Sequence, residues 1–234
     1  MTILEHLAEL RSRLLWIASL FFIGFLGAFF FINPVLVNYL KTQIPFSLTL
    51  YTLRITEGLE LSFELAALLS CMMIFPIILW QAWSFVKPGL YPEEQRLGKK
   101  YFPAILLLFL TGLVFGYFVI FPITVKAMLH FSIELGLTPL ITLKDYVLLL
   151  IKLVFSFGLL FQLPVLLLLL AKTGLINAAF MRKQRKYAYF IILIIAGILA
   201  PPELTSHLAM TLPLILLYEL SGTIVKKMEK EAVT

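Results

Sequence analysis

Charged residues are scarce in this 234-residue chain. Asp, Glu, Lys and Arg together make up 14% of it, whereas 61% of its residues are hydrophobic and its mean hydropathy is +1.00. A soluble domain carries about a quarter charged residues, most of them on its surface. The shortage of charge therefore excludes an ordinary soluble protein, and we expect an integral membrane protein.

Cysteine is nearly absent. Because Cys71 is the one cysteine, the chain can form neither an internal disulfide nor a cysteine metal cluster, and we expect this side chain to fill space in an apolar run. The first apolar run also lacks a small-x-small cleavage site at its far end, where Phe29, Phe30 and Phe31 stand instead. We expect a retained first helix rather than a cleaved signal peptide.

Long apolar runs predict the fold. A helix needs about 20 residues to cross the roughly 30 Å hydrocarbon core of a bilayer. Four runs meet this length and two later runs are shorter, the fifth covering only about 21 Å at 1.5 Å per residue. We expect an all-α polytopic membrane protein in which residues 1–234 form a single integral membrane domain with six transmembrane helices. The predicted spans, of which the fifth and sixth are short, are 14–32, 61–86, 102–125, 147–171, 187–200 and 208–225.

The basic residues predict the orientation. Lys and Arg gather in the short loops on the cytoplasmic side of a membrane. Fourteen of the 19 Lys and Arg fall on one side of the six predicted spans and four on the other, while Lys152 lies just inside the fourth span. We therefore expect the cytoplasmic (inner) membrane, with both termini in the cytoplasm. The fourteen are Arg11, Arg13, Lys87, Arg96, Lys99, Lys100, Lys172, Arg182, Lys183, Arg185, Lys186, Lys226, Lys227 and Lys230.

Carboxylates are few on the predicted cytoplasmic face. Glu9 precedes the first span, and Glu93 and Glu94 lie between the second and third. Each has cations nearby in the sequence, and an exposed pair such as Glu9 with Arg13 contributes at most about 1 kcal/mol. The alternative is a receptor for a cationic ligand, because a guanidinium binds a carboxylate through two hydrogen bonds. The spacing leaves both interpretations open.

Several motifs, ordered along nearly the whole chain, carry a family resemblance. Together they resemble the TatC family, the receptor subunit of the twin-arginine protein translocase, and they fit a six-span topology. The motifs are His6-Leu7-Ala8-Glu9-Leu10-Arg11-Ser12-Arg13-Leu14, the segment 76–94 with Trp80-Gln81-Ala82-Trp83 and Pro88-Gly89-Leu90-Tyr91-Pro92, Phe115-Gly116-Tyr117-Phe118, Phe161-Gln162-Leu163-Pro164, Arg182-Lys183-x-Arg185-Lys186 and Pro201-Pro202-Glu203.

The resemblance implies a function. The chain would recognise the paired arginines in the signal peptides of folded cargo, and it would export that cargo with TatA and TatB subunits, driven by the proton-motive force. Glu9 and Glu94 match the family's two signal-binding acidic positions, and Arg11 and Arg13 match its basic pair. The implied protein is a subunit of an oligomeric complex in the lipid bilayer and not an enzyme. No cofactor and no nucleic-acid partner are implied.

Polar residues at or near the membrane are candidate contacts for a partner helix, since such residues there commonly bond another helix. They are Gln162, Glu203, His207, Thr211 and Glu219. Gln162 stands where many TatC relatives have a glutamate, Glu203 replaces a usual aspartate, and His207 occupies a position that is often glutamine. Hydrogen bonds inside the bundle are the alternative for Gln162 and Thr211, and headgroup exposure is the alternative for Glu219.

A second class of function also fits six spans with scattered polar groups, namely a secondary transporter or channel for a small solute. Such a protein is expected to hold a coupled ion pair near the midplane, and none is obvious in the sequence. His6 and Glu9 are spaced as H-x-x-E rather than H-E-x-x-H, so they predict no zinc protease. We predict no catalytic and no metal site.

Overall fold

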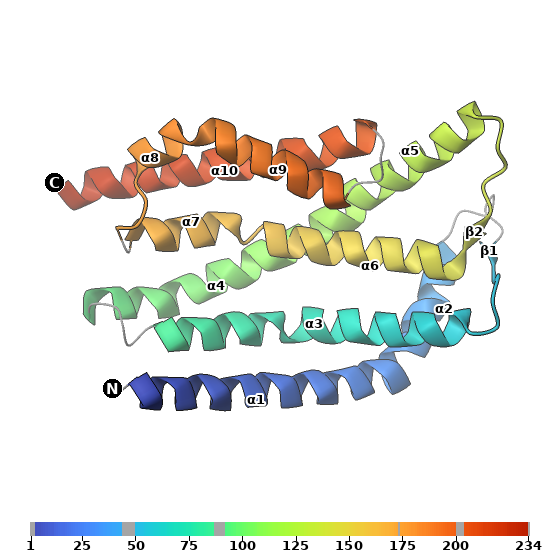
Figure 1. The fold of residues 1–234 in the computed structure, drawn as a ribbon, viewed down its shortest axis with the longest axis horizontal. Coiled ribbons are helices and arrows are strands. Elements are labelled where there is room, and N and C mark those ends of the chain that lie inside the picture. The colour runs from blue at the N-terminus through green and yellow to red at the C-terminus, as the bar shows by residue number, and fades with distance from the viewer. Residues whose placement is uncertain (1–2, 44–49, 87–91, 173, 200–203, 234) are drawn as a thin grey trace. The chain divides into compact units, whose positions relative to one another are not determined.

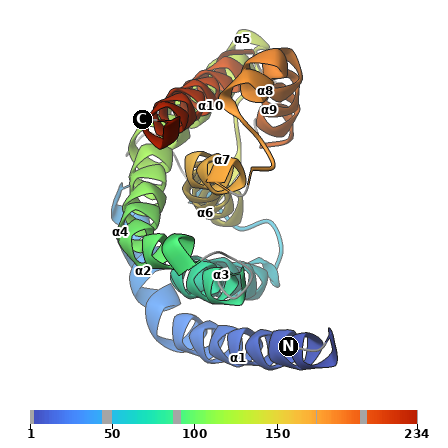
Figure 2. The ribbon, with the colours of Figure 1, turned by 90° about the vertical axis from the view of Figure 1, so that its left-hand side faces the viewer.

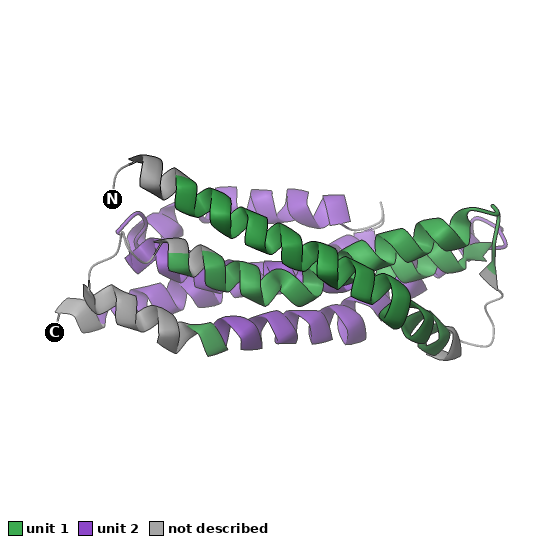
Figure 3. Cartoon of the chain, turned by 90° about the horizontal axis from the view of Figure 1, so that it is seen from below, with its two compact units in different colours: residues 1–103, 140–152 green, residues 104–139, 153–234 purple. Residues whose placement is uncertain are grey.

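The computed structural model describes residues 3–43, 50–86, 92–172, 174–199 and 204–233 (Figure 1). Within these ranges the chain is helical except for connecting turns and two strands of two residues each. It divides into two compact units, one of residues 1–103 with 140–152 and the other of residues 104–139 with 153–234 (Figure 3).

The first unit is built on two long helices, α1 (Ile3–Gly27) and α3 (Glu57–Val86), which lie side by side (Figure 1). They approach closely where α1 carries Gly24. The Ser70 hydroxyl donates a 2.8 Å hydrogen bond to the Phe21 carbonyl, and a Cβ at Gly24 would lie 2.8 Å from that hydroxyl oxygen. A small residue facing a hydroxyl is a common way for membrane helices to pack.

Short elements connect the predicted outer ends of this unit. Helix α2 (Asn33–Gln43) follows α1, and strand β1 (Leu50–Tyr51) pairs in parallel with β2 (Ile141–Thr142), which leads into α6 (Leu143–Leu160). The buried Glu57 carboxylate accepts a 2.7 Å hydrogen bond from the Leu53 N–H just before α3. The pairing of β1 with β2 joins two segments that are far apart in the sequence, residues 50–57 and 141–144.

The second unit holds the later helices. Figure 2 shows α8 and α9 beside α10, and α10 also packs against α7 and α5. In its core a Cβ at Gly112 would lie only 2.5 Å from the Phe157 carbonyl oxygen, so α4 and α6 meet main chain against main chain. The helices that contribute to this unit are α4 (Pro92–Phe115), α5 (Phe121–Glu134), α6, α7 (Leu163–Lys172), α8 (Ala178–Lys183), α9 (Arg185–Leu199) and α10 (Leu204–Val233).

Two π-helical turns, η1 (Ala28–Ile32) and η3 (Gly116–Ile120), occupy matching positions in long helices. Each is followed two residues later by a proline, Pro34 or Pro122. A proline has no N–H and its ring clashes with the carbonyl four residues back, so the preceding turn widens to bonds five residues apart. The wider turn lets both helices run past their prolines without ending.

The all-α polytopic membrane class is confirmed. Five segments in the described part of the chain are long and apolar enough to cross a membrane. The predicted fifth span corresponds to α9, whose 15 residues cover about 22 Å, so its shortness is also confirmed. The five long segments are Ala8–Leu40, Glu57–Gln81, Phe102–Glu134, Leu143–Lys172 and Leu204–Lys230.

Two predicted spans differ from the observed helices. Helix α10 has 30 residues, so the expectation of a short sixth helix is wrong for the helix as a whole. It continues beyond the apolar run because Lys, Glu and Met, which follow Val225, are good helix formers. The predicted fourth span, 147–171, is divided into α6 and α7 at Phe161 and Gln162, just before Pro164. Proline disfavours helical geometry in the residue that precedes it.

Candidate functional site

Glu9 and Arg13 lie one turn apart on α1 and are joined by two hydrogen bonds. The Arg13 Nη2 and Nε donate to the same carboxylate oxygen, Glu9 Oε1, at 2.6 and 3.1 Å. Both side chains are mostly covered, with 21% of Arg13 and 28% of Glu9 exposed. The pairing expected from the i,i+4 spacing is therefore confirmed, and it is less screened by solvent than a fully exposed pair.

Arg13 also binds the end of α3. Its Nη1 donates to Gln81 Oε1 at 2.8 Å and to the Gln81 carbonyl at 3.2 Å, and its Nη2 lies 3.4 Å from the Ser84 carbonyl oxygen. The Ser84 carbonyl is among the last four of α3, which lack partners within the helix and favour a cation nearby. Arg13 thus fastens Glu9 to the last two turns of α3, and these side chains form the Glu9–Arg13–Gln81 cluster.

One oxygen of Glu9 meets no hydrogen-bond donor among the described residues. Glu9 Oε2 accepts no hydrogen bond from the described residues, because both bonds from Arg13 go to Oε1. An ionised carboxylate has acceptor capacity on each oxygen. The arrangement can therefore accept a further cationic donor at Oε2 without releasing Arg13.

The other two predicted signal-binding residues are placed less fully. Arg11 is exposed and makes no ion pair within the described part of the chain, and the role of the predicted basic pair stays a prediction. Glu94 is the third residue of α4, but its side chain lies outside the described residues. Helix α4 begins six residues after the end of α3, and six residues of chain span at most about 21 Å. The start of α4, which carries Glu94, therefore lies within about 21 Å of the end of α3.

Three of the predicted intramembrane polar residues bond within the second unit. Gln162 Nε2 lies 3.3 Å from the Ile105 carbonyl oxygen, while its Oε1 is buried without a partner among the described residues. Thr211 Oγ1 donates 2.7 Å to the carbonyl of His207, in its own helix. His207 Nε2 lies 3.0 Å from the Leu193 carbonyl oxygen, which connects α10 to α9. Gln162 and Thr211 therefore each make one hydrogen bond within the second unit, and a partner contact by either residue stays a prediction.

Glu219 is an ion-pair partner rather than a simply exposed residue. Its carboxylate binds the Arg185 guanidinium and accepts a 2.5 Å hydrogen bond from the Tyr189 hydroxyl. These contacts connect α10 to the start of α9. Glu203, the remaining predicted polar residue, lies outside the described residues.

Two interactions were not predicted from the sequence. The first is the contact between Arg13 and Gln81. Gln81 belongs to one of the family motifs but was given no role, although a polar residue near the end of an apolar helix indicates a possible hydrogen-bond partner. Lys144 Nζ lies 2.6 Å from Glu60 Oε2 and 3.1 Å from Glu64 Oε1. The sequence indicated this contact only weakly: Glu60 and Glu64 are spaced i,i+4 after one predicted outer loop, and Lys144 lies in the other.

Comparison with known proteins decides the family. The family model described as "Sec-independent protein translocase protein (TatC)" matches residues 5–213 of the chain. The chain belongs to the TatC family. It is 43% identical over 235 residues to the TatC protein of Listeria innocua, a match covering 99% of this chain and 95% of the relative. It is 41% identical over 232 residues to TatCy of Bacillus subtilis, covering 99% of this chain and 91% of that protein.

A solved structure of the TatC family has the same fold. The crystal structure of the twin-arginine translocase receptor TatC in DDM is 33% identical in sequence and matches with a TM-score of 0.83, covering 94% of this chain and 99% of that one. The function predicted from the sequence, the receptor subunit of the twin-arginine translocase, is confirmed. The chain is a membrane protein and not an enzyme.

Proposed function

We propose that this TatC-family chain binds the paired arginines of a twin-arginine signal peptide at Glu9 and Glu94, on the cytoplasmic side of the inner membrane. The observation that carries the proposal is the open oxygen of Glu9. Arg13 holds Oε1 through two hydrogen bonds, and Oε2 accepts none from the described residues. A signal arginine would therefore meet a carboxylate that is already oriented.

The magnitude of this contact supports a receptor role. Hydrogen bonds between charged groups contribute roughly 1.5–3 kcal/mol, about twice the value for neutral groups. The partly covered position of Glu9 favours such a contact over a fully exposed one. Each arginine captured in this way would strengthen binding by roughly tenfold to a hundredfold.

The surrounding cations support selectivity. Arg11 and Arg13 flank the proposed site on α1, and most of the remaining cytoplasmic face is basic. A cationic signal is repelled wherever it meets cations alone, so it binds well only beside a carboxylate. We include Glu94 because it lies in the first turn of α4 and matches the family's second acidic position in the sequence.

The proposal includes the membrane setting and the partners. We infer both termini in the cytoplasm from the basic residues, 14 of which lie on that side of the predicted spans. We also infer that the two units act as a single membrane domain within an oligomeric complex with TatA- and TatB-type subunits. Gln162 is half-buried and its Oε1 has no donor among the described residues, so it is one candidate for a partner contact. Glu203, His207, Thr211 and Glu219 remain weaker candidates.

Site-specific crosslinking tests this function. A twin-arginine signal peptide carrying a photoreactive group is added to membranes containing the chain, and the Glu9→Gln and Glu94→Gln variants are compared with the parent. Each variant is expected to crosslink at least about tenfold less, because glutamine keeps the shape but removes the charge. A twin-lysine peptide serves as the control and should crosslink weakly to all three. Undiminished crosslinking of both variants would overturn the proposed site.

A further inference from the structure

The N–H donors of Arg13 are all used within the chain. Nε and Nη2 donate to Glu9 Oε1, and Nη2 also lies 3.4 Å from the Ser84 carbonyl oxygen. Nη1 donates to Gln81 twice, at 2.8 Å to its side-chain oxygen and at 3.2 Å to its main-chain oxygen. A guanidinium carries five N–H groups and no acceptor. Arg13 therefore has no donor left for a ligand, although it lies at the centre of the Glu9–Arg13–Gln81 cluster.

The contact with Arg13 also fixes the orientation of the Gln81 side chain. Because arginine only donates hydrogen bonds, the amide oxygen of Gln81 must face the guanidinium, and the amide nitrogen Nε2 is the end turned away from it. Gln81 is half-buried, and its Nε2 makes no hydrogen bond to a described residue. The two N–H groups on Nε2 are therefore available to a ligand, in a direction that Arg13 sets.

The cluster thus offers a ligand one acceptor and one donor group. Glu9 Oε2 accepts, Gln81 Nε2 donates, and a single guanidinium bridges the two side chains, at 2.6 Å to Glu9 Oε1 and 2.8 Å to Gln81 Oε1. A signal arginine fits the acceptor but cannot satisfy the donor, because arginine has no acceptor of its own. The donor therefore needs a second group of the ligand.

We propose that Gln81 binds a main-chain carbonyl of the signal peptide, next to the arginine that Glu9 captures. This contact rests on the proposed receptor function and adds a main-chain hydrogen bond to the charge contact. Every residue of a peptide carries a carbonyl, and an extended peptide has no partner for it within its own chain. Gln81 is then a binding residue, and Arg13 positions both Gln81 and Glu9.

The surroundings of Gln81 favour a neutral acceptor. Gln81 lies in the last two turns of α3, where the negative end of the helix dipole disfavours an anion, and Glu9 adds a carboxylate close by. A phosphate or carboxylate of the ligand is therefore disfavoured beside Nε2. Water is the other neutral acceptor, but water would make binding independent of the carbonyls of the peptide.

Ester scanning of the peptide tests this contact. In a set of twin-arginine peptides, one peptide bond at a time near the arginine pair is replaced by an ester, whose carbonyl is a weaker acceptor than that of an amide. Fluorescence anisotropy with the full chain in nanodiscs measures the affinity of each peptide. At one position, the ester should bind the parent about threefold to tenfold more weakly than the amide. The same ester should bind Gln81→Met as tightly as the amide does.

Two variants separate a binding role of Gln81 from a positioning role. Gln81→Met removes both the contact to Arg13 and the N–H groups, whereas Gln81→Glu keeps an acceptor for Arg13 and removes only the N–H groups. The added charge of Gln81→Glu acts on the amide and the ester peptide alike, so the two peptides are compared within each variant. Their difference should disappear in both variants. If Gln81 only held Arg13 in place, the ester would weaken binding to Gln81→Glu as much as to the parent.

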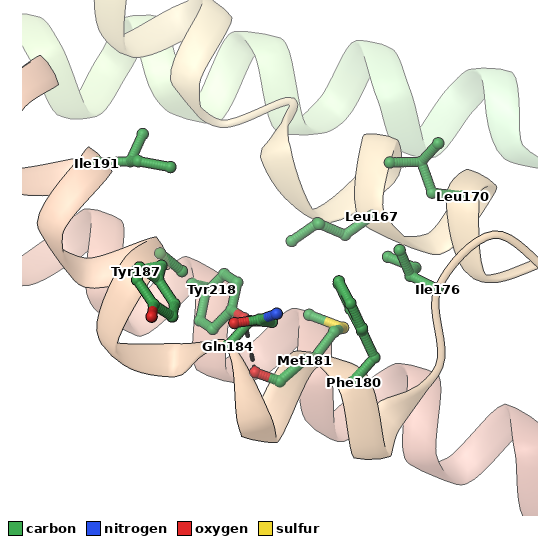
Figure 4. A pocket seen from close by; sticks show the side chains of 10 residues that line it. Leu167, Leu170, Ile176, Phe180, Met181, Gln184, Tyr187, Ile191 and Tyr218 are labelled. Atoms are coloured by element: carbon green, nitrogen blue, oxygen red, sulfur yellow. Dashed lines mark hydrogen bonds between the residues drawn. The ribbon is translucent and has the colours of Figure 1, made fainter.

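Gln184→Met is the matched control. Gln184 is also half-buried and lies on the predicted cytoplasmic side, but it belongs to the second unit, where it lines an apolar cavity with Met181 and Tyr218 (Figure 4). The ester should weaken binding to this variant as much as to the parent. The contact would be overturned if no ester weakened binding to the parent, or if the ester effect persisted in either Gln81 variant.

Failure of the receptor site itself would look different. Glu9→Gln would then bind the twin-arginine peptide as tightly as the parent, and the parent would not prefer it to the twin-lysine peptide. Both proposals would be wrong in that case. If the loss in Glu9→Gln were seen without any ester effect, only the role of Gln81 would be wrong.

Discussion

Arg13 holds one oxygen of Glu9 through two hydrogen bonds while its Nη1 bonds Gln81 on the neighbouring helix. A lysine ammonium cannot make this arrangement, because it is a point charge without the planar fork of the guanidinium. The geometry therefore separates two roles of Arg13. Its charge contributes to the field of the cytoplasmic face, and its shape orients the Glu9 carboxylate.

Arg13→Lys should separate these roles. The variant keeps the charge but loses the fork, so we expect a twin-arginine peptide to bind about threefold to tenfold more weakly, a smaller loss than for Glu9→Gln. Fluorescence anisotropy of a labelled peptide with the chain in nanodiscs measures the affinity. Arg54→Lys makes the same exchange on the predicted outer side and should leave the affinity unchanged. An undiminished affinity for Arg13→Lys would show that orientation by the fork is unimportant.

Gly112 should not tolerate a methyl group. A Cβ there would lie 2.5 Å from the Phe157 carbonyl oxygen and 2.9 Å from Gly158 Cα, and main-chain atoms cannot move aside as a flexible side chain can. We expect Gly112→Ala to lower the free energy of unfolding by about 1–3 kcal/mol. Thermal denaturation in detergent measures this change.

Gly27 provides the matched control for that experiment. A Cβ at Gly27 would meet nothing within 4 Å, and alanine favours a helix by roughly 1 kcal/mol over glycine. Gly27→Ala should therefore leave the denaturation midpoint unchanged or raise it. If the two variants behaved alike, the close approach of α4 and α6 would be wrong.

Much of the fold followed from apolar run lengths, because a bilayer fixes how many residues a spanning helix needs. The effect of each proline on its helix was not predicted, because it depends on hydrogen bonds inside the helix. Pro34 and Pro122 widen the turns before them instead of ending the helix, whereas Pro164 lies directly after a division between two helices. The difference depends on whether the preceding carbonyls find other donors, which the sequence does not encode locally.

The candidate site was predictable in part. The i,i+4 spacing predicted the contact between Glu9 and Arg13, since it arises within one helix. The contact with Gln81 joins residues 68 positions apart, so no local spacing indicates it. The assignment of Glu94 depended on family motifs, and it stays a prediction because that side chain lies outside the described residues.

Gln162 should be dispensable for folding but important for assembly. Its Nε2 makes one long hydrogen bond, 3.3 Å to the Ile105 carbonyl oxygen, and its Oε1 is buried without a described partner. Gln162→Leu removes a weak bond and an unsatisfied acceptor together, so stability should change by less than about 1 kcal/mol. Copurification of a TatB-type subunit should nevertheless decrease severalfold.

Thr111→Val is the control for Gln162, since the Thr111 hydroxyl bonds the Leu107 carbonyl of its own helix. That variant should change neither stability nor copurification appreciably. Full copurification with Gln162→Leu would assign Gln162 to the bundle alone and remove it from the proposed partner surface.

Lys144 should hold together the outer segments of the first unit. Its ammonium binds Glu60 at 2.6 Å and Glu64 at 3.1 Å, and only 14% of the side chain is exposed. Lys144→Met removes the cation and leaves two carboxylates one turn apart on α3, which repel each other. Strand β2 ends two residues before Lys144, so its pairing with β1 should then open more often, and the amide hydrogens of the two strands should exchange roughly fivefold faster.

Hydrogen–deuterium exchange over residues 50–57 and 141–146 measures this opening. Lys126→Met removes a lysine from the same predicted side of the membrane, but Lys126 is exposed and makes no ion pair with a described residue, so exchange should stay at the parent rate. Glu64→Gln should give an intermediate rate, because the shorter contact to Glu60 remains. If exchange in the two strands were the same in Lys144→Met as in the parent, backbone pairing and the hydrogen bond that the Leu53 N–H donates to Glu57 would suffice to hold these segments.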